Sequence, residues 1–145
     1  LYSGMSTYTV APDGAVLIGR LITTYQKNSA GAADTAWLDS STVFTASYAR
    51  WLFDSLWSAK FPRVKYSTDE RTSAPGVLTL SAVRSELTAI YQLLIDGGHC
   101  ENMAAFQAAL IVQQNGSDPT RIDAVVPLFF TNPIHVVAVQ FQIEL

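Results

Sequence analysis

The sequence predicts a single α+β domain over residues 1–145, in which a mixed or antiparallel sheet packs against two main helices. Three observations predict this class. Short β-rich segments flank turn-forming residues near both ends of the chain, and two long central segments carry apolar residues at helical spacing. The sequence contains neither an internal repeat nor a low-complexity tract. The expected order is two strands, two main helices and three further strands.

The first element is predicted to be a β-hairpin. Residues 8–10 and 15–25 are rich in β-forming residues, and Pro12, Asp13 and Gly14 between them are typical of a turn. Both faces of the second strand are largely apolar, which predicts a strand that is covered on two sides. The Gly-, Ala-, Ser- and Asn-rich residues 26–34 predict a loop.

Two helices are predicted next. Asp39, Ser40 or Ser41 can cap a helix that runs to about Lys60 before Pro62, and Thr79 can cap a second helix that ends at Gly97 and Gly98. The polar residues 67–76 between them predict a mobile loop. The apolar stripe of the first helix is Phe44, Tyr48, Trp51, Leu52, Leu56 and Ala59. That of the second is Val83, Leu87, Ile90, Tyr91 and Leu94.

The last third of the chain is predicted to hold a short helix over residues 102–108 and a second hairpin. Residues 110–114 and 121–126 flank a turn at 115–119. Residues 134–145 alternate cleanly and predict a long final strand with a single charged residue, Glu144.

That final strand is a candidate interface. An exposed edge without Lys, Pro or a bulge invites pairing with another chain, although an ordinary internal edge strand would have the same pattern. The alternative is strand exchange between subunits by β-augmentation. The residues assigned to this exchange are Val136, Val137, Ala138, Val139, Gln140, Phe141, Gln142 and Ile143.

The composition points to a surface that is partly interface. Charged residues make up 14% of the chain, against roughly a quarter in typical soluble domains. Because interfaces are depleted in charge, much of this surface is expected to contact partners. The net charge of −3 argues against nucleic acid as the main partner. A single cysteine excludes an internal disulfide framework and a Cys-rich metal site.

The chemistry-bearing residues form no convincing catalytic pattern. His99 and Cys100 are adjacent, and neighbours on an extended chain point to opposite sides, so a loop cysteine is the simpler interpretation. His135 on an apolar strand face is expected to be packed and hydrogen-bonded. Metal-ligand spacings and Gly-rich phosphate loops are absent from the sequence. We therefore expect neither an enzyme nor a cofactor, with a hydrolase that uses Cys100 as the alternative.

A small basic cluster follows the first predicted helix, at Lys60, Arg63 and Lys65. Complementary charge can fix the register of an acidic protein partner, so a contact patch is one interpretation. A solvated helix end, favoured by the helix dipole, is the other.

Four segments of the sequence resemble the Mu-like phage tail sheath family. They are RLITTYQKNSAGAAD at residues 20–34 followed by Leu38 and Asp39, KFPRVK at 60–65, RSE at 84–86, and NGSDPTRID at 115–123. They occur in the family's order and extend over nearly the whole chain. Leu80 departs from the family, which often has Pro after the capping Thr, and the first helix is richer in Trp.

The resemblance implies the inner, tube-proximal C-terminal domain of a contractile tail sheath protein. Strands from neighbouring subunits would complete its sheet, with residues 134–145 as the C-terminal inter-subunit strand. The implied partners are further copies in a helical sheath and the tail tube protein, with no nucleic acid and no small-molecule ligand. The implied location is the virion tail, and the host cytoplasm during assembly. A monomeric host-recognition module remains an alternative.

Overall fold

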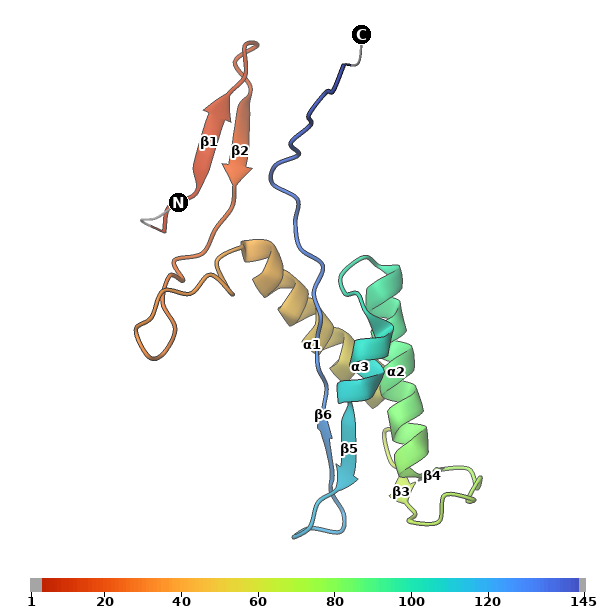
Figure 1. The fold of residues 1–145 in the computed structure, drawn as a ribbon. Helices are drawn as coiled ribbons and strands as arrows, with labels where there is room; N and C mark the ends of the chain where they lie inside the picture. Colours follow the sequence, from red (N-terminus) through yellow and green to blue (C-terminus); the bar gives the residue numbers. More distant parts are fainter. Residues whose placement is uncertain (1–3, 144–145) are drawn as a thin grey trace.

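The computed structural model describes residues 4–143, which form three helices and three separate two-stranded ladders (Figure 1). The order is β1 (Thr7–Val10), β2 (Val16–Arg20), α1 (Ser40–Lys60), β3 (Lys65–Tyr66), β4 (Val77–Leu78), α2 (Leu80–Asp96), α3 (Met103–Ala109), β5 (Ile111–Gln114) and β6 (Ile122–Val125). The predicted α+β class is confirmed. The described strands pair two by two, in small antiparallel and parallel ladders, and the completion of a sheet by strands from neighbouring subunits stays a prediction.

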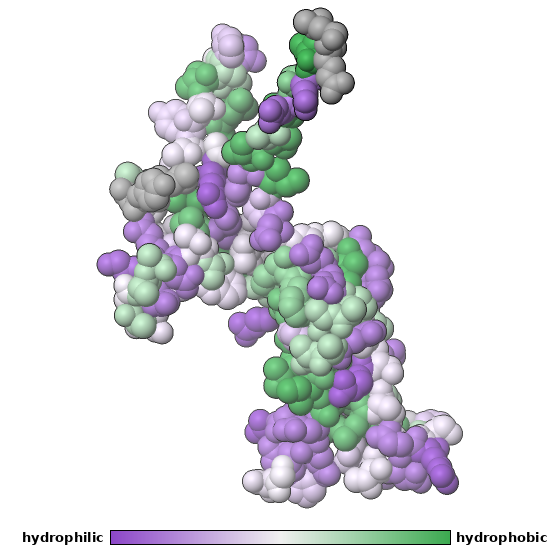
Figure 2. Space-filling model, viewed as in Figure 1, coloured by the Kyte–Doolittle hydropathy of each residue, from purple (hydrophilic) through white to green (hydrophobic). Residues whose placement is uncertain are grey.

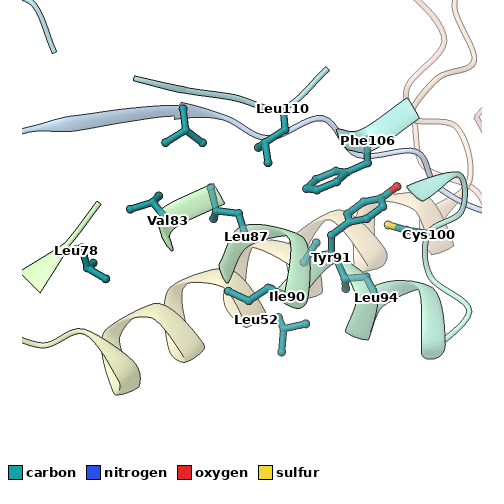
Figure 3. Packing of buried hydrophobic residues seen from close by; sticks show 12 residues of the cluster. Leu52, Leu78, Val83, Leu87, Ile90, Tyr91, Leu94, Cys100, Phe106 and Leu110 are labelled. Atoms are coloured by element: carbon teal, nitrogen blue, oxygen red, sulfur yellow. The ribbon is translucent and has the colours of Figure 1, made fainter. Parts of the chain in front are cut away.

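The helices form the body of the molecule. Helix α2 lies at its centre and contacts α1, α3 and β5. Figure 3 shows the ring of Phe106 from α3 facing that of Tyr91 from α2. The two rings stack with centroids 3.8 Å apart and an interplanar angle of 7°. The buried cluster consists of Ala49, Leu52, Leu78, Val83, Leu87, Ile90, Tyr91, Leu94, Cys100, Phe106, Leu110 and Val112.

Helix α2 follows its sequence signals closely. The Thr79 hydroxyl accepts a hydrogen bond from the backbone N–H of Ala82 at 3.3 Å, which satisfies one free donor of the first turn. All five residues of the predicted stripe are buried. After Gly97, the chain turns at Gly98 with a φ of 71°, a conformation that glycine adopts without a steric penalty.

Helix α1 has the predicted bounds but not the predicted buried face. Its buried residues are Ala49 and Leu52, and Leu56 is partly buried against the same cluster. Phe44, Tyr48 and Trp51 are exposed, with Phe44 at 69%. The predicted stripe therefore mixed two faces of the helix, of which one packs against α2 and the other faces outward. No helix within residues 4–143 combines the length and the apolarity needed to cross a membrane.

The hairpin β1–β2 is confirmed, with Val10 opposite Val16 and a turn in which Gly14 has a φ of 86°. Its second strand ends at Arg20, five residues before the predicted end. The prediction that this strand is covered on two sides is wrong for the described residues, because both of its faces are exposed. Figure 1 shows the hairpin projecting away from the helical body.

Of the other two ladders, one was predicted from the sequence and one was not. The hairpin β5–β6 is confirmed, with Gln114 opposite Ile122, and the side chain of Asn115 accepts hydrogen bonds from the N–H groups of Ser117 and Asp118 in the turn. The parallel pair β3–β4 was not predicted. It joins two residues from each side of the loop over residues 67–76.

The chain after β6 first joins the body and then leaves it. Glu101 donates its backbone N–H to Phe129 at 2.9 Å, and Thr131 donates to the carbonyl of His99 at 3.3 Å. Residues 132–143 then extend away from the body on the side of the hairpin (Figure 1). The predicted strand forms no ladder within the described part of this segment, and Glu144 and Leu145 lie outside the described residues.

Candidate assembly surfaces

The polar residues of the four motifs hold the scaffold together. Arg20 at the end of β2 donates from Nε and Nη2 to the two carboxylate oxygens of Asp39, at 2.8 and 2.7 Å. This bidentate pair ties the hairpin to the start of α1. The hydrogen bond from Arg20 holds the pKa of Asp39 below its usual value. Sequence reasoning had allowed Asp39 to cap the helix with its side chain, but this side chain makes no capping hydrogen bond.

A second pair closes the loop between β2 and α1. The Tyr25 hydroxyl donates to Asp34 at 2.6 Å, and this hydrogen bond lowers the pKa of the Asp34 carboxyl group. The carboxylate of Asp34 also accepts from the backbone N–H of Ala36. The first motif therefore forms a loop that is stabilised by hydrogen bonds from its own side chains.

The remaining motifs make similar contacts. In the turn between β5 and β6, Asn115 and Arg121 both donate to Asp123, at 2.7 and 2.6 Å, and together lower its pKa, with Asn115 as the larger cause. On α2, Arg84 donates to the carbonyl of Leu110 at 2.9 Å, and Glu86 pairs with Lys60 of α1. Many polar side chains of the motifs are therefore occupied by contacts within the chain, and the apolar surfaces are considered next as places where a partner could bind.

The hairpin β1–β2 is the first such surface. Its exposed apolar residues are Tyr8, Val10, Val16, Leu17 and Ile18, with Ile18 at 68% exposure. They occupy both faces of the ladder, because neighbouring residues of a strand point to opposite sides. Figure 2 shows hydrophobic side chains along this projection. An isolated two-stranded ladder with two apolar faces needs further contacts to bury them.

The extended segment over residues 132–143 is the second surface. All eight residues predicted for strand exchange, from Val136 to Ile143, are exposed in the described structure, and Phe141 is 85% exposed. The backbone of residues 132–143 forms no hydrogen bond with any other described residue. The segment thus offers unpaired backbone groups and a mostly apolar sequence, interrupted by Gln140 and Gln142, in an extended form.

A groove beside α1 is a third surface, which sequence reasoning missed because it placed Trp51 in the core and did not consider Phe53 or Trp57. Trp51, Phe53 and Trp57 line a groove of about 740 Å³ together with Leu87, Val126 and Leu128. Tyr48 stacks on Trp51 with ring centroids 5.7 Å apart. Two aromatic faces on one helix were the available signal, since a helix with a single apolar stripe would not need both.

The predicted basic cluster is divided. Lys60 pairs with Glu86, and its ammonium group lies 5.6 Å from the centroid of the Phe61 ring. Arg63 and Lys65 are exposed, and neither has an ion pair within residues 4–143. The structure therefore leaves these two cations available to a partner and uses the third internally.

The Cys100 thiol has the wrong surroundings for a nucleophile. Cys100 is 2% exposed, and burial raises the pKa of its thiol, which favours the protonated form. The ring of His99 lies against Tyr48, with centroids 5.0 Å apart. No group of three or more metal-ligating side chains gathers in the described part of the chain. The hydrolase alternative loses its main support.

His135 was expected to be packed and hydrogen-bonded. Its Nε2 lies 3.6 Å from the carboxylate of Asp39, and its side chain is 38% exposed. This places it beside the ion pair at the root of the hairpin, beyond hydrogen-bonding distance and only partly buried.

Comparison with known proteins adds one relative. The chain is 35% identical over 125 residues to the Mu-like prophage FluMu tail sheath protein of Haemophilus influenzae. No family model matches the chain. The matched region is 85% of this chain and 26% of that protein, so the chain spans about a quarter of its relative's length. It is a partial homologue of a Mu-like tail sheath protein.

Proposed function

We propose that this chain is the inner domain of a structural, non-enzymatic subunit of a contractile phage tail sheath. In this proposal the subunits polymerise helically around the tail tube in the virion, after assembly in the host cytoplasm. Contraction of the sheath drives the tube through the host envelope. The partial homology to a tail sheath protein and the four motifs support this role.

The observation that carries the proposal is the segment Val136 to Ile143, which is extended, apolar, exposed and without backbone partners among the described residues. A segment of this kind gains backbone hydrogen bonds and buries apolar area by adding to the sheet of another chain. We assign residues 136–143 as the strand that one subunit gives to a neighbour.

The hairpins offer edges that could accept such a strand. In β5–β6, Asn115 donates its N–H to the carbonyl of Arg121, so Arg121, Asp123 and Val125 turn their backbone groups toward β5. Ile122 and Ala124 then turn theirs to the open side of β6. The outer edges of β1 and β2 are open in the same way, because each strand pairs only with the other among residues 4–143.

Backbone ladders that are shared between subunits suit a sheath whose subunits must stay connected while it contracts. A contact between unlike surfaces of two copies that does not close into a ring generates a helical filament. Backbone ladders between copies can persist while side-chain contacts are exchanged, and the energy released by repacking would drive contraction from a kinetically trapped state. The exposed face of α1 provides apolar area for such an exchange.

The tube contact is assigned to the basic cluster of Lys60, Arg63 and Lys65. Arg63 and Lys65 are exposed and can meet an acidic surface, whereas Lys60 would first have to leave Glu86. Complementary charge of this kind sets register and orientation more than affinity.

The test is assembly of the complete sheath polypeptide expressed with its tube protein and examined by electron microscopy. Deletion of residues 137–145 is expected to abolish sheath polymerisation. Val139→Pro, which removes one backbone donor, should shorten or prevent sheaths, whereas the matched Val139→Ala should assemble. Sheaths of normal length from the deletion variant would contradict the proposal.

A further inference from the structure

The groove beside α1 is an apolar face of the body that lacks a cover. Its volume is about 740 Å³, which leaves room for several further side chains. The side chains that line it from α1 and from the residues after β6 pack on the core with one side and are only partly buried. The apolar lining comes from three parts of the chain: Trp51, Phe53, Trp57, Leu87, Val126 and Leu128.

An unpaired backbone edge runs along the same groove. In β6, Ile122 and Ala124 turn their backbone groups away from β5. The next residues in this alternation, Val126 and Leu128, form no backbone hydrogen bond with any described residue, and Pro127 between them has no N–H to donate. A strand laid along this edge would direct every second side chain into the groove.

The two layers of the body differ in width at this place. Packed helices lie about 8–10 Å apart and paired strands about 4.8 Å apart, so that two adjacent helices are as wide as about four strands. Helices α1 and α2 contact each other, but the ladder beside them has two strands, and it contacts α2 through β5. The groove is therefore the part of the helical layer that the two strands do not reach.

The segment over residues 134–143 has the side-chain pattern that such a site requires. Gln140 and Gln142 lie on one face of this sequence if it is extended as a strand, and a mostly apolar set occupies the other. In each copy the segment extends away from β6 beyond Thr131 (Figure 1), so the strand that reaches this edge is taken from another copy. The second face consists of His135, Val137, Val139, Phe141 and Ile143.

The exposed area is sufficient for contacts with several copies. The chain exposes 10776 Å², which is about 3,500 Å² more than a compact protein of its mass would expose. Each partner of a standard interface contributes about 800 Å². Because every copy would carry both the groove and the segment, a contact between these unlike surfaces can repeat along a filament.

We propose that the groove beside α1 receives the side chains of Val137, Val139 and Phe141 from a second copy, whose segment pairs with the open edge of β6. This inference rests on the proposed function and adds to it the accepting edge, the inward face of the strand and the cavity that this face fills. Gln140 and Gln142 then remain on the outer side of the added strand.

The test is photo-cross-linking in sheaths of the complete polypeptide, assembled with the tube protein. One variant carries Phe141→p-benzoylphenylalanine, on the inward face of the strand. The matched control carries Gln142→p-benzoylphenylalanine, on the outward face. After irradiation, a denaturing gel separates links between copies from links within one chain, and mass spectrometry identifies the linked residues.

We expect the variant at position 141 to give a cross-linked dimer, joined to residues 47–57 or 126–128 of the other copy. The control at position 142 should give at least about fivefold less of this product. Adding Ser47→Trp, which fills the groove from its exposed rim, should lower the yield from position 141 at least about fivefold, in the range that overpacking produces. Ser41→Trp, the same exchange at an exposed position of α1 outside the groove, should leave the yield unchanged.

Cross-links from position 141 to β1 or β2 would overturn this inference and leave strand exchange itself intact. Cross-links confined to one chain, or equal yields at the groove from positions 141 and 142, would also overturn it. A yield that Ser47→Trp does not reduce would show that the groove is not the site. Failure of the proposed function would be seen separately, as sheaths of normal length from the polypeptide without residues 137–145.

Discussion

The helical body and the two extensions use the same kinds of residue in opposite ways. In the body, apolar side chains from α1, α2, α3 and β5 meet in one cluster, where Tyr91, Leu94 and Phe106 are fully buried. In the hairpin and in residues 132–143, valine, isoleucine, leucine and phenylalanine are mostly exposed. Figure 2 shows hydrophobic side chains on both projections. The body completes its own core, and the extensions do not.

This difference explains the unusual composition of the chain. The accessible surface is 10776 Å², whereas a compact protein of 15.8 kDa would expose about 7,300 Å². The excess accessible surface arises because the molecule is elongated and its two extensions project from the body, as Figure 1 shows. A charge content of 14% suits such a molecule if the arms are covered by partners in its working state.

A matched pair of phenylalanine substitutions tests the contrast between the two regions most sharply. Phe106→Ala in the body should lower the free energy of unfolding by about 3–5 kcal/mol, because it opens a cavity beside Tyr91. Phe141→Ala in the extended segment should leave it unchanged within about 0.5 kcal/mol. Urea unfolding followed by circular dichroism checks both. Equal losses would mean that the segment packs on the body.

A smaller effect is expected from the polar end of the same core. The Tyr91 hydroxyl donates to the carbonyl of Glu101 at 2.6 Å, next to the point where residue 129 joins the body. Tyr91→Phe should therefore cost about 1 kcal/mol by removing this hydrogen bond and leaving the carbonyl without it. The same unfolding measurement applies, and a loss as large as that of Phe106→Ala would contradict the assignment.

Acid should weaken the hydrogen bonds and ion pairs that hold the hairpin and the loops before it weakens the apolar core. The pKa values of Asp34, Asp39 and Asp123 are all lowered in the folded chain. Their stabilisation is therefore complete above the unfolded value of about 3.9 and is lost as pH falls through the lower folded values. Unfolding free energies at pH 6.0 and pH 3.0 measure this loss. Asp123→Asn should reduce the difference between them, and an unchanged difference would argue against the paired carboxylates.

The smallest expected effect on stability lies in the hairpin. Ile18→Ser exchanges an exposed apolar residue for a polar one, so the isolated chain should lose less than about 0.5 kcal/mol. The complete polypeptide should, in contrast, form fewer or shorter sheaths, because a partner would meet a polar residue in place of an apolar one. A large loss in the isolated chain would indicate that β1–β2 is already covered.

Sequence reasoning succeeded where local signals decide the structure. The cap at Thr79, the stripe from Val83 to Leu94 and the turn at Asn115 all act within a few residues of chain. Their positions follow from helical periodicity and from side chains that bond to nearby backbone groups. The three helices and two hairpins were therefore predictable, with small errors in their ends except for β2, which ends at Arg20 and not near Tyr25.

What sequence reasoning missed depends on contacts between distant segments. Asp39 was one of three candidate caps for α1, and it stands at the N-cap position, but its carboxylate binds Arg20 of β2 instead of a backbone N–H of the helix. Trp51 and Phe44 were placed in the core because periodicity reveals an apolar face without saying what covers it. The two-residue pair β3–β4 has no periodic signal at all. Of the candidate site, the exposed apolar character of residues 136–143 was predicted, whereas their pairing with a neighbour stays a prediction.

The most direct test of the account is amide hydrogen exchange of residues 7–20 and 134–143, compared between the isolated chain and the same region within assembled sheaths. The account predicts exchange of residues 134–143 at nearly unprotected rates in the isolated chain and strong protection in the sheath, with α2 protected in both. Rapid exchange of residues 134–143 in assembled sheaths would contradict it, because the segment would then have no backbone partner in any state.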